Sequence, residues 1–281
     1  MIRTFAVIGD PIDHSLSPTI HNAAYRHLDL ECTYIAYKID KNELESGIQS
    51  LKSIKISGFN VTIPHKIEIM KLLDDVDEDC KLIGAANTIV NDNGSLKGYN
   101  TDMDGFLAPI KNRDITIKNS NVLLLGAGGA SRAIIAGFAK EHVKKITVIN
   151  RTIEKANDLS KFGKNLEIES DVIPLDDLET LNDNYDFIVN ASSLGLNNES
   201  NIIPTKLIDS NTTVYDIVYK PVNTALIKDS KKKNAEIIYG YEMLLSLIHI
   251  SEPTRRYAIS YAVFCLKKKR GGGGGGGGGG G

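Results

Sequence analysis

The stretch that decides the fold is Asn121-Val-Leu-Leu-Leu-Gly-Ala-Gly-Gly-Ala-Ser-Arg132. Its apolar residues 122–125 are typical of a strand that is buried on both faces, and residues 132–140 have the spacing of a helix. A second apolar run, residues 145–149, follows at the distance of the next strand. Because a strand precedes the Gly-x-Gly-x-x-small turn and a helix follows it, the stretch predicts a dinucleotide-binding βαβ unit. Without that context, the same glycines usually mark only a turn.

The small residues of this turn have distinct predicted roles. Gly126 permits a tight turn after the strand, and Gly128 has no Cβ, so a pyrophosphate can approach the backbone. Small Ala130 or Ser131 lets the helix pack closely on the sheet. The N–H groups and the positive dipole end of the helix would then face the phosphates.

The residues after the second strand indicate which dinucleotide binds. An NAD site usually has Asp or Glu there for the ribose 2′-hydroxyl. This chain has Asn150-Arg151-Thr152 instead, with Lys155 one helical turn further. A guanidinium can bind a 2′-phosphate through two hydrogen bonds, whereas a carboxylate would repel it. We therefore predict NADP; the alternative is that these cations only begin a solvated helix.

Length and composition limit the class of protein. The chain has 281 residues, enough for two domains, and a net charge of −2. Neither nucleic acid nor an anionic membrane is therefore an expected partner. The sequence has no apolar run near the roughly 20 residues that span a bilayer, no signal peptide and no metal-type spacing of its cysteines. We expect an intracellular, soluble protein, located in the cytoplasm and without a metal.

The last residues of the chain are not expected to belong to the fold. Residues 271–281 are all glycine and cannot bury apolar surface. Residues 247–270 are interpreted as translated adapter sequence, so that 247–281 as a whole are expected to be a non-native tail. The alternative is a genuine C-terminal helix with a glycine tag.

Residues 1–103 predict a βαβ-type lobe with polar residues at its strand ends. Strands are expected at residues 5–9, 34–39, 58–64, 84–92 and 96–102, the last two joined by an Asn93-Gly94 turn. Helices are expected at 43–51, at 65–73 with Lys66 in the first turn, and from Ser17 as N-cap with Pro18 as first helical residue. Such strand ends bind ligands in open α/β sheets. The polar residues found there are Ser15, Ser17, Thr62, Lys66, Asn87 and Asp102.

The second half continues the α/β pattern. A buried strand begins at Tyr185 and leads into a Ser/Gly loop, and further strands are expected at residues 213–219 and 236–240, with a helix at 224–231 between them.

Together these motifs resemble the shikimate dehydrogenase family. The resemblance covers about residues 3–246, and the blocks stand in the family's order. They are Ser15-Leu-Ser-Pro18, Asn60-Val-Thr-Ile-Pro-His-Lys66, Gly84-Ala-Ala-Asn-Thr88, Asn100-Thr-Asp102, Gly126-Ala-Gly-Gly-Ala-Ser-Arg132, Asn150-Arg-Thr152, Asn190-Ala-Ser-Ser-Leu-Gly195, Asp216-Ile-Val-Tyr-Lys-Pro221 and Gly240-Tyr-Glu-Met-Leu-Leu245.

The resemblance implies an α/β fold with a substrate-binding lobe at residues 1–103 and an NADP-binding Rossmann domain at residues 104–240. Residues 241–246 would begin a C-terminal helix that packs back on the first domain. The implied reaction is the reversible, NADPH-dependent reduction of 3-dehydroshikimate to shikimate in aromatic amino-acid biosynthesis. Family members occur as monomers and as homodimers, so the resemblance leaves the oligomeric state open.

The resemblance also implies the site residues. The substrate would be surrounded by Ser15, Ser17, Thr62, Lys66, Asn87, Asp102 and Tyr219. The cofactor would contact Gly126, Ala127, Gly128, Gly129, Ala130, Asn150, Arg151, Thr152, Lys155, Ile217, Gly240 and, as a weaker candidate, Glu78. Lys66 and Asp102 would form the catalytic pair, in which the ammonium stabilises charge on the ketone oxygen. Which of the two transfers the proton stays open.

This chain departs from the family's pattern at two positions. The family usually has arginine where Lys155 stands, so Arg151 is expected to make more of the 2′-phosphate contact. It also has a substrate-binding glutamine where Leu247 stands, so one substrate hydrogen bond is expected to be absent. The alternatives are an NAD-preferring quinate/shikimate dehydrogenase, a methylenetetrahydrofolate dehydrogenase, and a non-catalytic NADPH-binding protein whose C-terminus is altered.

Overall fold

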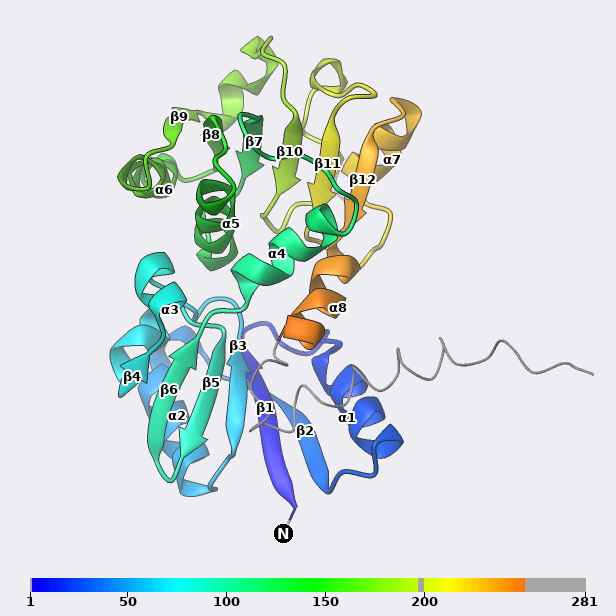
Figure 1. Ribbon diagram of the computed structural model, residues 1–281. Helices are drawn as coiled ribbons and strands as arrows, with labels where there is room; N and C mark the ends of the chain where they lie inside the picture. Colours follow the sequence, from blue (N-terminus) through cyan, green and yellow to red (C-terminus); the bar gives the residue numbers. More distant parts are fainter. Residues whose placement is uncertain (1, 197–199, 251–281) are drawn as a thin grey trace, which may run out of the picture. The chain divides into compact units, whose positions relative to one another are not determined.

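The computed structural model describes residues 2–196 and 200–250 and is drawn in Figure 1. Its contacts divide the chain into two compact units, each taken by itself below. Residues 2–77, 86–99 and 248–250 belong to the first unit, and residues 78–85 and 100–247 belong to the second. Of the predicted non-native tail, residues 251–281 lie outside the described part, and the backbone of 247–250 ends helix α8 (Gly240–Ile250).

The first unit has a mixed six-stranded sheet in the order β2-β1-β3-β5-β6-β4. Its strands are β1 (Arg3–Gly9), β2 (Cys32–Lys38), β3 (Gly58–Val61), β4 (Asp75–Val76), β5 (Thr88–Asp92) and β6 (Ser95–Tyr99). Strand β1 pairs in parallel with β2 and with β3, and the connections contain α1 (Ser17–His27) and α2 (Leu44–Ser53). Strands β5 and β6 form an antiparallel hairpin. Asn93 and Gly94 at its turn both have positive φ, which confirms the predicted turn.

The second unit has a six-stranded sheet in which all strands are parallel (Figure 1). Its strands are β7 (Asn121–Leu125), β8 (Lys145–Ile149), β9 (Glu169–Ile173), β10 (Phe187–Asn190), β11 (Thr213–Asp216) and β12 (Glu236–Tyr239). Its helices are α3 (Glu78–Ile83), α4 (Asp102–Lys111), α5 (Gly129–Lys140), α6 (Ile153–Asn165), α7 (Ala225–Lys232) and α8. The order β12-β11-β10-β7-β8-β9 is that of a doubly wound dinucleotide-binding sheet.

Strand β7 lies at the centre of this sheet, and both of its faces are covered. Val122 and Leu124 belong to one buried cluster, whereas Leu123 and Leu125 belong to another. Alternate side chains of a strand point to opposite faces, so an unbroken apolar run is what a strand covered on both faces requires. The predicted strand and its burial are confirmed. The strand order reverses between β7 and β10, where such sheets bind ligands.

The predicted helix at residues 65–73 is wrong. Only the 3-10 helix η2 (Glu68–Leu72) forms there, and Lys66 lies in the turn before it. Ile69 is the one residue of η2 that is buried. A single apolar contact holds one turn in place but does not offset the cost of nucleating a longer helix.

Two predicted element ends are also corrected. Helix α1 begins at Ser17 with Leu16 as N-cap, and the Ser17 N–H donates to the Ser15 hydroxyl at 3.3 Å, so Ser17 is not the cap. Asp102 does not close a strand: β6 ends at Tyr99, and Asp102 begins α4. The Asn100 side chain redirects the chain there, because its oxygen accepts the Asp102 N–H at 3.0 Å and its amide donates to the Ala85 carbonyl at 2.8 Å.

The division into units differs from the predicted boundary at residue 103. Residues 78–85 belong to the second unit. Arg132 on α5 explains this, because its Nε donates to the Ile83 carbonyl and its guanidinium lies 4.2 Å from the centre of the Phe162 ring. These contacts join α3 to α5 and α6. The start of α8, residues 241–246, belongs to the second unit as well.

Candidate active site

The turn after β7 requires glycine at its first position. Gly126 has a φ of +102°, and a Cβ there would lie 2.7 Å from the Ala191 carbonyl oxygen. Its N–H donates to the Ile149 carbonyl at 2.8 Å. The turn is therefore held between the ends of β8 and β10, and the predicted tight turn at Gly126 is confirmed.

The second glycine of the turn faces open space. A Cβ on Gly128 would meet no atom within 4 Å, and Gly128 is exposed. Its N–H donates to the hydroxyl of Ser131 at 3.2 Å, and Ser131 is fully buried at the start of α5. The amides of Gly129 and Ala130 lie in the first helical turn, where N–H groups have no partner within the helix. Open space beside such amides at the positive end of a helix fits a phosphate group.

The cationic segment begins next to this turn. Leu125 and Ile149 are register partners, so Asn150 follows β8 beside Gly126. The Asn150 amide donates to the Thr152 carbonyl at 2.8 Å, and α6 starts at the next residue, Ile153. Arg151, Thr152 and Lys155 are exposed. In the part of the chain that the structure describes, neither Arg151 nor Lys155 has a carboxylate within ion-pair distance, so these cations fit a phosphate.

The half of the sheet formed by β10, β11 and β12 carries a buried polar network for which no role was predicted, although Asn190 and Asp216 begin two of the sequence blocks quoted above. Asp216 at the end of β11 is 0% exposed. Its Oδ1 accepts hydrogen bonds from Asn190 Nδ2 at 2.9 Å and the Val218 N–H at 3.1 Å, and its Oδ2 accepts one from the Thr224 hydroxyl at 2.6 Å. Burial raises the pKa of Asp216, although these hydrogen bonds act in the opposite direction. A carboxylate directly after a buried strand was the available signal.

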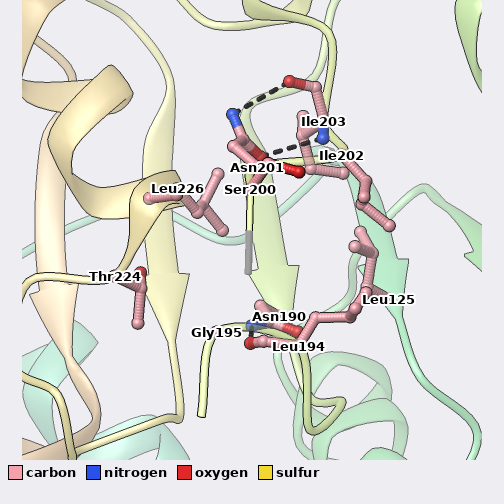
Figure 2. A pocket seen from close by; sticks show the side chains of 11 residues that line it. Leu125, Asn190, Leu194, Gly195, Ser200, Asn201, Ile202, Ile203, Thr224 and Leu226 are labelled. Carbon is pink, nitrogen blue, oxygen red and sulfur yellow. Dashed lines mark hydrogen bonds between the residues drawn. The ribbon is translucent and has the colours of Figure 1, made fainter. Parts of the chain in front are cut away.

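This network holds the loops that follow β10 and β11. Asn190 Oδ1 accepts hydrogen bonds from the N–H and hydroxyl of Ser192, and Asn190 Nδ2 also donates to the Leu194 carbonyl at 2.9 Å. Figure 2 shows Asn190, Leu194 and Thr224 around a cavity of about 20 Å³, which has room for one water molecule but not for a nicotinamide ring. The cavity is therefore part of the supporting structure.

Two predicted cofactor residues meet just beyond this network. A Cβ on Gly240 would lie 2.3 Å from the Ile217 carbonyl oxygen, so the start of α8 lies against the exit of β11. Only glycine permits this approach. Glu78, the weaker candidate, is exposed at the start of α3.

The first unit gathers five predicted substrate residues at one edge of its sheet. Thr62 follows β3, and its Cγ2 would lie 2.4 Å from a Cβ on Gly9, the last residue of β1. The Lys66 carbonyl accepts the Ala86 N–H at 2.9 Å. Asn87 follows Ala86, and its carbonyl accepts the Val61 N–H at 2.8 Å. Ser15 and Ser17 lie half-buried after β1. These residues thus follow or contact the ends of β1 and β3, and their part in substrate binding stays a prediction.

The other two predicted substrate residues lie in the second unit. Asp102 is 2% exposed at the start of α4, and Tyr219 is half-buried in the loop after β11. Lys66 belongs to the first unit and Asp102 to the second, so their pairing stays a prediction.

In residues 2–196 and 200–250, no helix has the length and apolar character to cross a membrane. Over those same residues, no group of three or more His, Cys, Asp or Glu side chains is placed to hold a metal ion.

Comparison with known proteins gives consistent matches over most of the chain. The family model described as shikimate dehydrogenase substrate binding domain matches residues 7–89, and the model described as shikimate / quinate 5-dehydrogenase matches residues 109–213. A protein from Nitrosopumilus maritimus named shikimate dehydrogenase (NADP(+)) is 62% identical over 245 residues, which cover 87% of this chain and 90% of that protein.

Solved structures agree with these matches. The shikimate 5-dehydrogenase from Thermus thermophilus, in complex with NADP(H) and shikimate, has a TM-score of 0.77 at 29% identity and covers 94% of this chain and 99% of its own. The enzyme from Listeria monocytogenes, in complex with shikimate and NAD, has a TM-score of 0.79 at 28% identity, with coverage of 94% and 96%.

Proposed function

The chain belongs to the shikimate dehydrogenase family, and from this premise we propose that it catalyses the reversible, NADPH-dependent reduction of 3-dehydroshikimate to shikimate in aromatic amino-acid biosynthesis. One observation carries the choice of cofactor. The exposed Arg151 follows β8, next to the strand β7 that leads into the open glycine turn, at the position where an NAD site has a carboxylate.

The predicted Rossmann domain, residues 104–240, would hold the cofactor. The amides of the turn from Gly126 to Ala130 would bind the pyrophosphate, and Arg151 with Asn150, Thr152 and Lys155 would bind the 2′-phosphate. Ile217 and Gly240 would contact the other half of the dinucleotide, with Glu78 as a further candidate. When bound, NADPH supplies the hydride.

The predicted substrate-binding lobe, residues 1–103, would hold the substrate. Ser15, Ser17, Thr62 and Asn87 offer hydroxyl and amide groups that suit the hydroxyls and carboxylate of a polyhydroxy acid, and Tyr219 would complete the set. The Lys66 ammonium would bind the ketone oxygen and stabilise the negative charge that develops there. Asp102 would orient this ammonium, and one member of the pair would deliver the proton to that oxygen.

Oxidation of shikimate tests this proposal directly. With NADP⁺ and shikimate, we expect the absorbance of NADPH to appear, and we expect much lower kcat/KM with NAD⁺ or with quinate. A higher kcat/KM with NAD⁺ would favour the NAD-preferring quinate/shikimate dehydrogenase. Tight NADPH binding without turnover would favour the non-catalytic alternative.

The proposed location is the cytoplasm. In support, the described cysteines, Cys32 and Cys80, form no disulfide, and thiols stay reduced in that compartment. The oligomeric state, monomer or homodimer, is a prediction that light scattering checks.

A further inference from the structure

A chain of hydrogen bonds in the first unit leads from its interior to Asn87. Tyr34 on β2 is 1% exposed, and its hydroxyl donates to Asn60 Oδ1 at 2.5 Å. Asn60 on β3 donates from Nδ2 to the Thr88 hydroxyl at 3.1 Å. The Thr88 hydroxyl donates in turn to Asn87 Oδ1 at 3.0 Å. Asn60 and Thr88 are direct register partners on neighbouring strands, which places their side chains next to each other.

The direction of these hydrogen bonds follows from one main-chain contact. Asn60 Nδ2 also lies 3.3 Å from the Asn87 carbonyl oxygen, which can only accept a hydrogen bond. The amide nitrogen of Asn60 must therefore face Asn87 and Thr88, and its oxygen must face Tyr34. The Thr88 oxygen accepts from Asn60, and the Thr88 hydroxyl donates its own proton to Asn87 Oδ1. The Asn87 amide is thereby held with its oxygen toward Thr88 and its N–H groups turned elsewhere.

The inner end of the chain is firmly held. The Asn22 side chain binds both the N–H and the carbonyl of Tyr34, at 2.9 and 2.7 Å. The ring of His21 stacks on the Tyr34 ring with 4.2 Å between centroids. Burial raises the pKa of Tyr34, so its hydroxyl remains a donor at ordinary pH.

We propose that Tyr34, Asn60 and Thr88 are positioning residues that fix Asn87 as a hydrogen-bond donor to an oxygen of the substrate. This inference rests on the proposed function, in which Asn87 contacts shikimate. An amide held in one orientation selects a ligand oxygen with a free lone pair, and an amide free to rotate loses that preference.

Thr88 gives the sharpest test, because two substitutions separate its hydroxyl from its shape. Thr88→Val keeps the volume and removes the hydroxyl, and we expect the KM for shikimate to rise about five- to tenfold, the size of one lost hydrogen bond. Thr88→Ser keeps the hydroxyl and should restore the KM for shikimate. The KM for NADP⁺ should be the same in all three proteins, which a general loss of structure would not produce.

Tyr34 supplies a second test that does not depend on how Thr88→Val folds. Tyr34→Phe removes only the first donor, and we expect the KM for shikimate to rise two- to fivefold. Tyr37→Phe on the same strand is the matched control, since Tyr37 is 41% exposed, and it should leave both KM values unchanged.

The outcomes separate the inference from the function on which it rests. Wild-type KM values for shikimate in both Thr88→Val and Tyr34→Phe would overturn the inference while shikimate turnover remained. Parallel increases of both KM values, without rescue by serine, would also overturn it. A wild-type protein without shikimate turnover would refute the proposed function and the inference together.

Discussion

Alanine substitutions at Gly126 and Gly128 should have opposite consequences, although the two residues are separated by one position. At Gly126, φ is +102° and a Cβ would lie 2.7 Å from Ala191 O and 2.9 Å from Ser192 N. At Gly128, φ is −100° and a Cβ would meet nothing within 4 Å. We therefore expect Gly126→Ala to lower the free energy of unfolding and Gly128→Ala to weaken NADPH binding.

The magnitudes follow from these contacts. A left-handed backbone costs a residue with a Cβ about 1–2 kcal/mol, and the clash with main-chain atoms adds about 1–3 kcal/mol. Gly126→Ala should thus lower the free energy of unfolding by about 2–5 kcal/mol, a large part of the stability of an ordinary domain. Gly128→Ala should change it by less than about 0.5 kcal/mol. The new methyl group would occupy the space next to the helix amides, so NADPH binding should weaken at least tenfold.

Urea unfolding measures the first quantity, and fluorescence titration with NADPH measures the second. The reasoning is refuted if Gly128→Ala lowers stability as much as Gly126→Ala does. It is also refuted if Gly128→Ala binds NADPH as tightly as the wild type, because the space at Gly128 would then not hold the phosphates.

Three further predictions test the cations and the buried histidine. Arg151→Ala should weaken NADPH binding by about 10- to 100-fold, the size of a charge-assisted pair, but leave NADH binding unchanged. Lys161→Ala on α6, the helix that follows Arg151, is the control, and equal losses for both cofactors would exclude the 2′-phosphate contact. Lys66→Ala should lower kcat by orders of magnitude with the Kd for NADPH unchanged, whereas the control Lys71→Ala should not lower kcat. A near-normal kcat in Lys66→Ala would show that Lys66 takes no part in the chemistry. Burial lowers the pKa of His21 from 6.5 to about 4. Between these pH values the unfolded chain binds a proton that the folded chain does not. The free energy of unfolding should therefore fall by about 3 kcal/mol as the pH drops from 7 to 4. His21→Phe keeps a ring against Tyr34 and should lose that part of the pH dependence in urea unfolding at several pH values; an identical pH dependence in both proteins would contradict the assignment.

Local patterns in the sequence determined the dinucleotide-binding unit and much of the candidate site. The run Val122–Leu125, the glycines after it and the Asn93-Gly94 turn act through backbone conformation and strand burial, which depend on neighbours in the chain. Thr62, Lys66 and Asn87 were expected near strand ends, and in the structure Thr62 follows β3 and Asn87 directly precedes β5.

Only the tertiary structure decided which distant residues support that site. Asp216 finds Asn190 and Thr224, and Thr88 finds Asn60, because sheet register brings separate strands side by side. Contacts of Arg132 place residues 78–85 in the second unit, and burial of Ile69 alone leaves Lys66 in a turn before a short 3-10 helix. Such pairings depend on which side chains meet after folding, and neither residue of a pair signals its partner by its position in the chain.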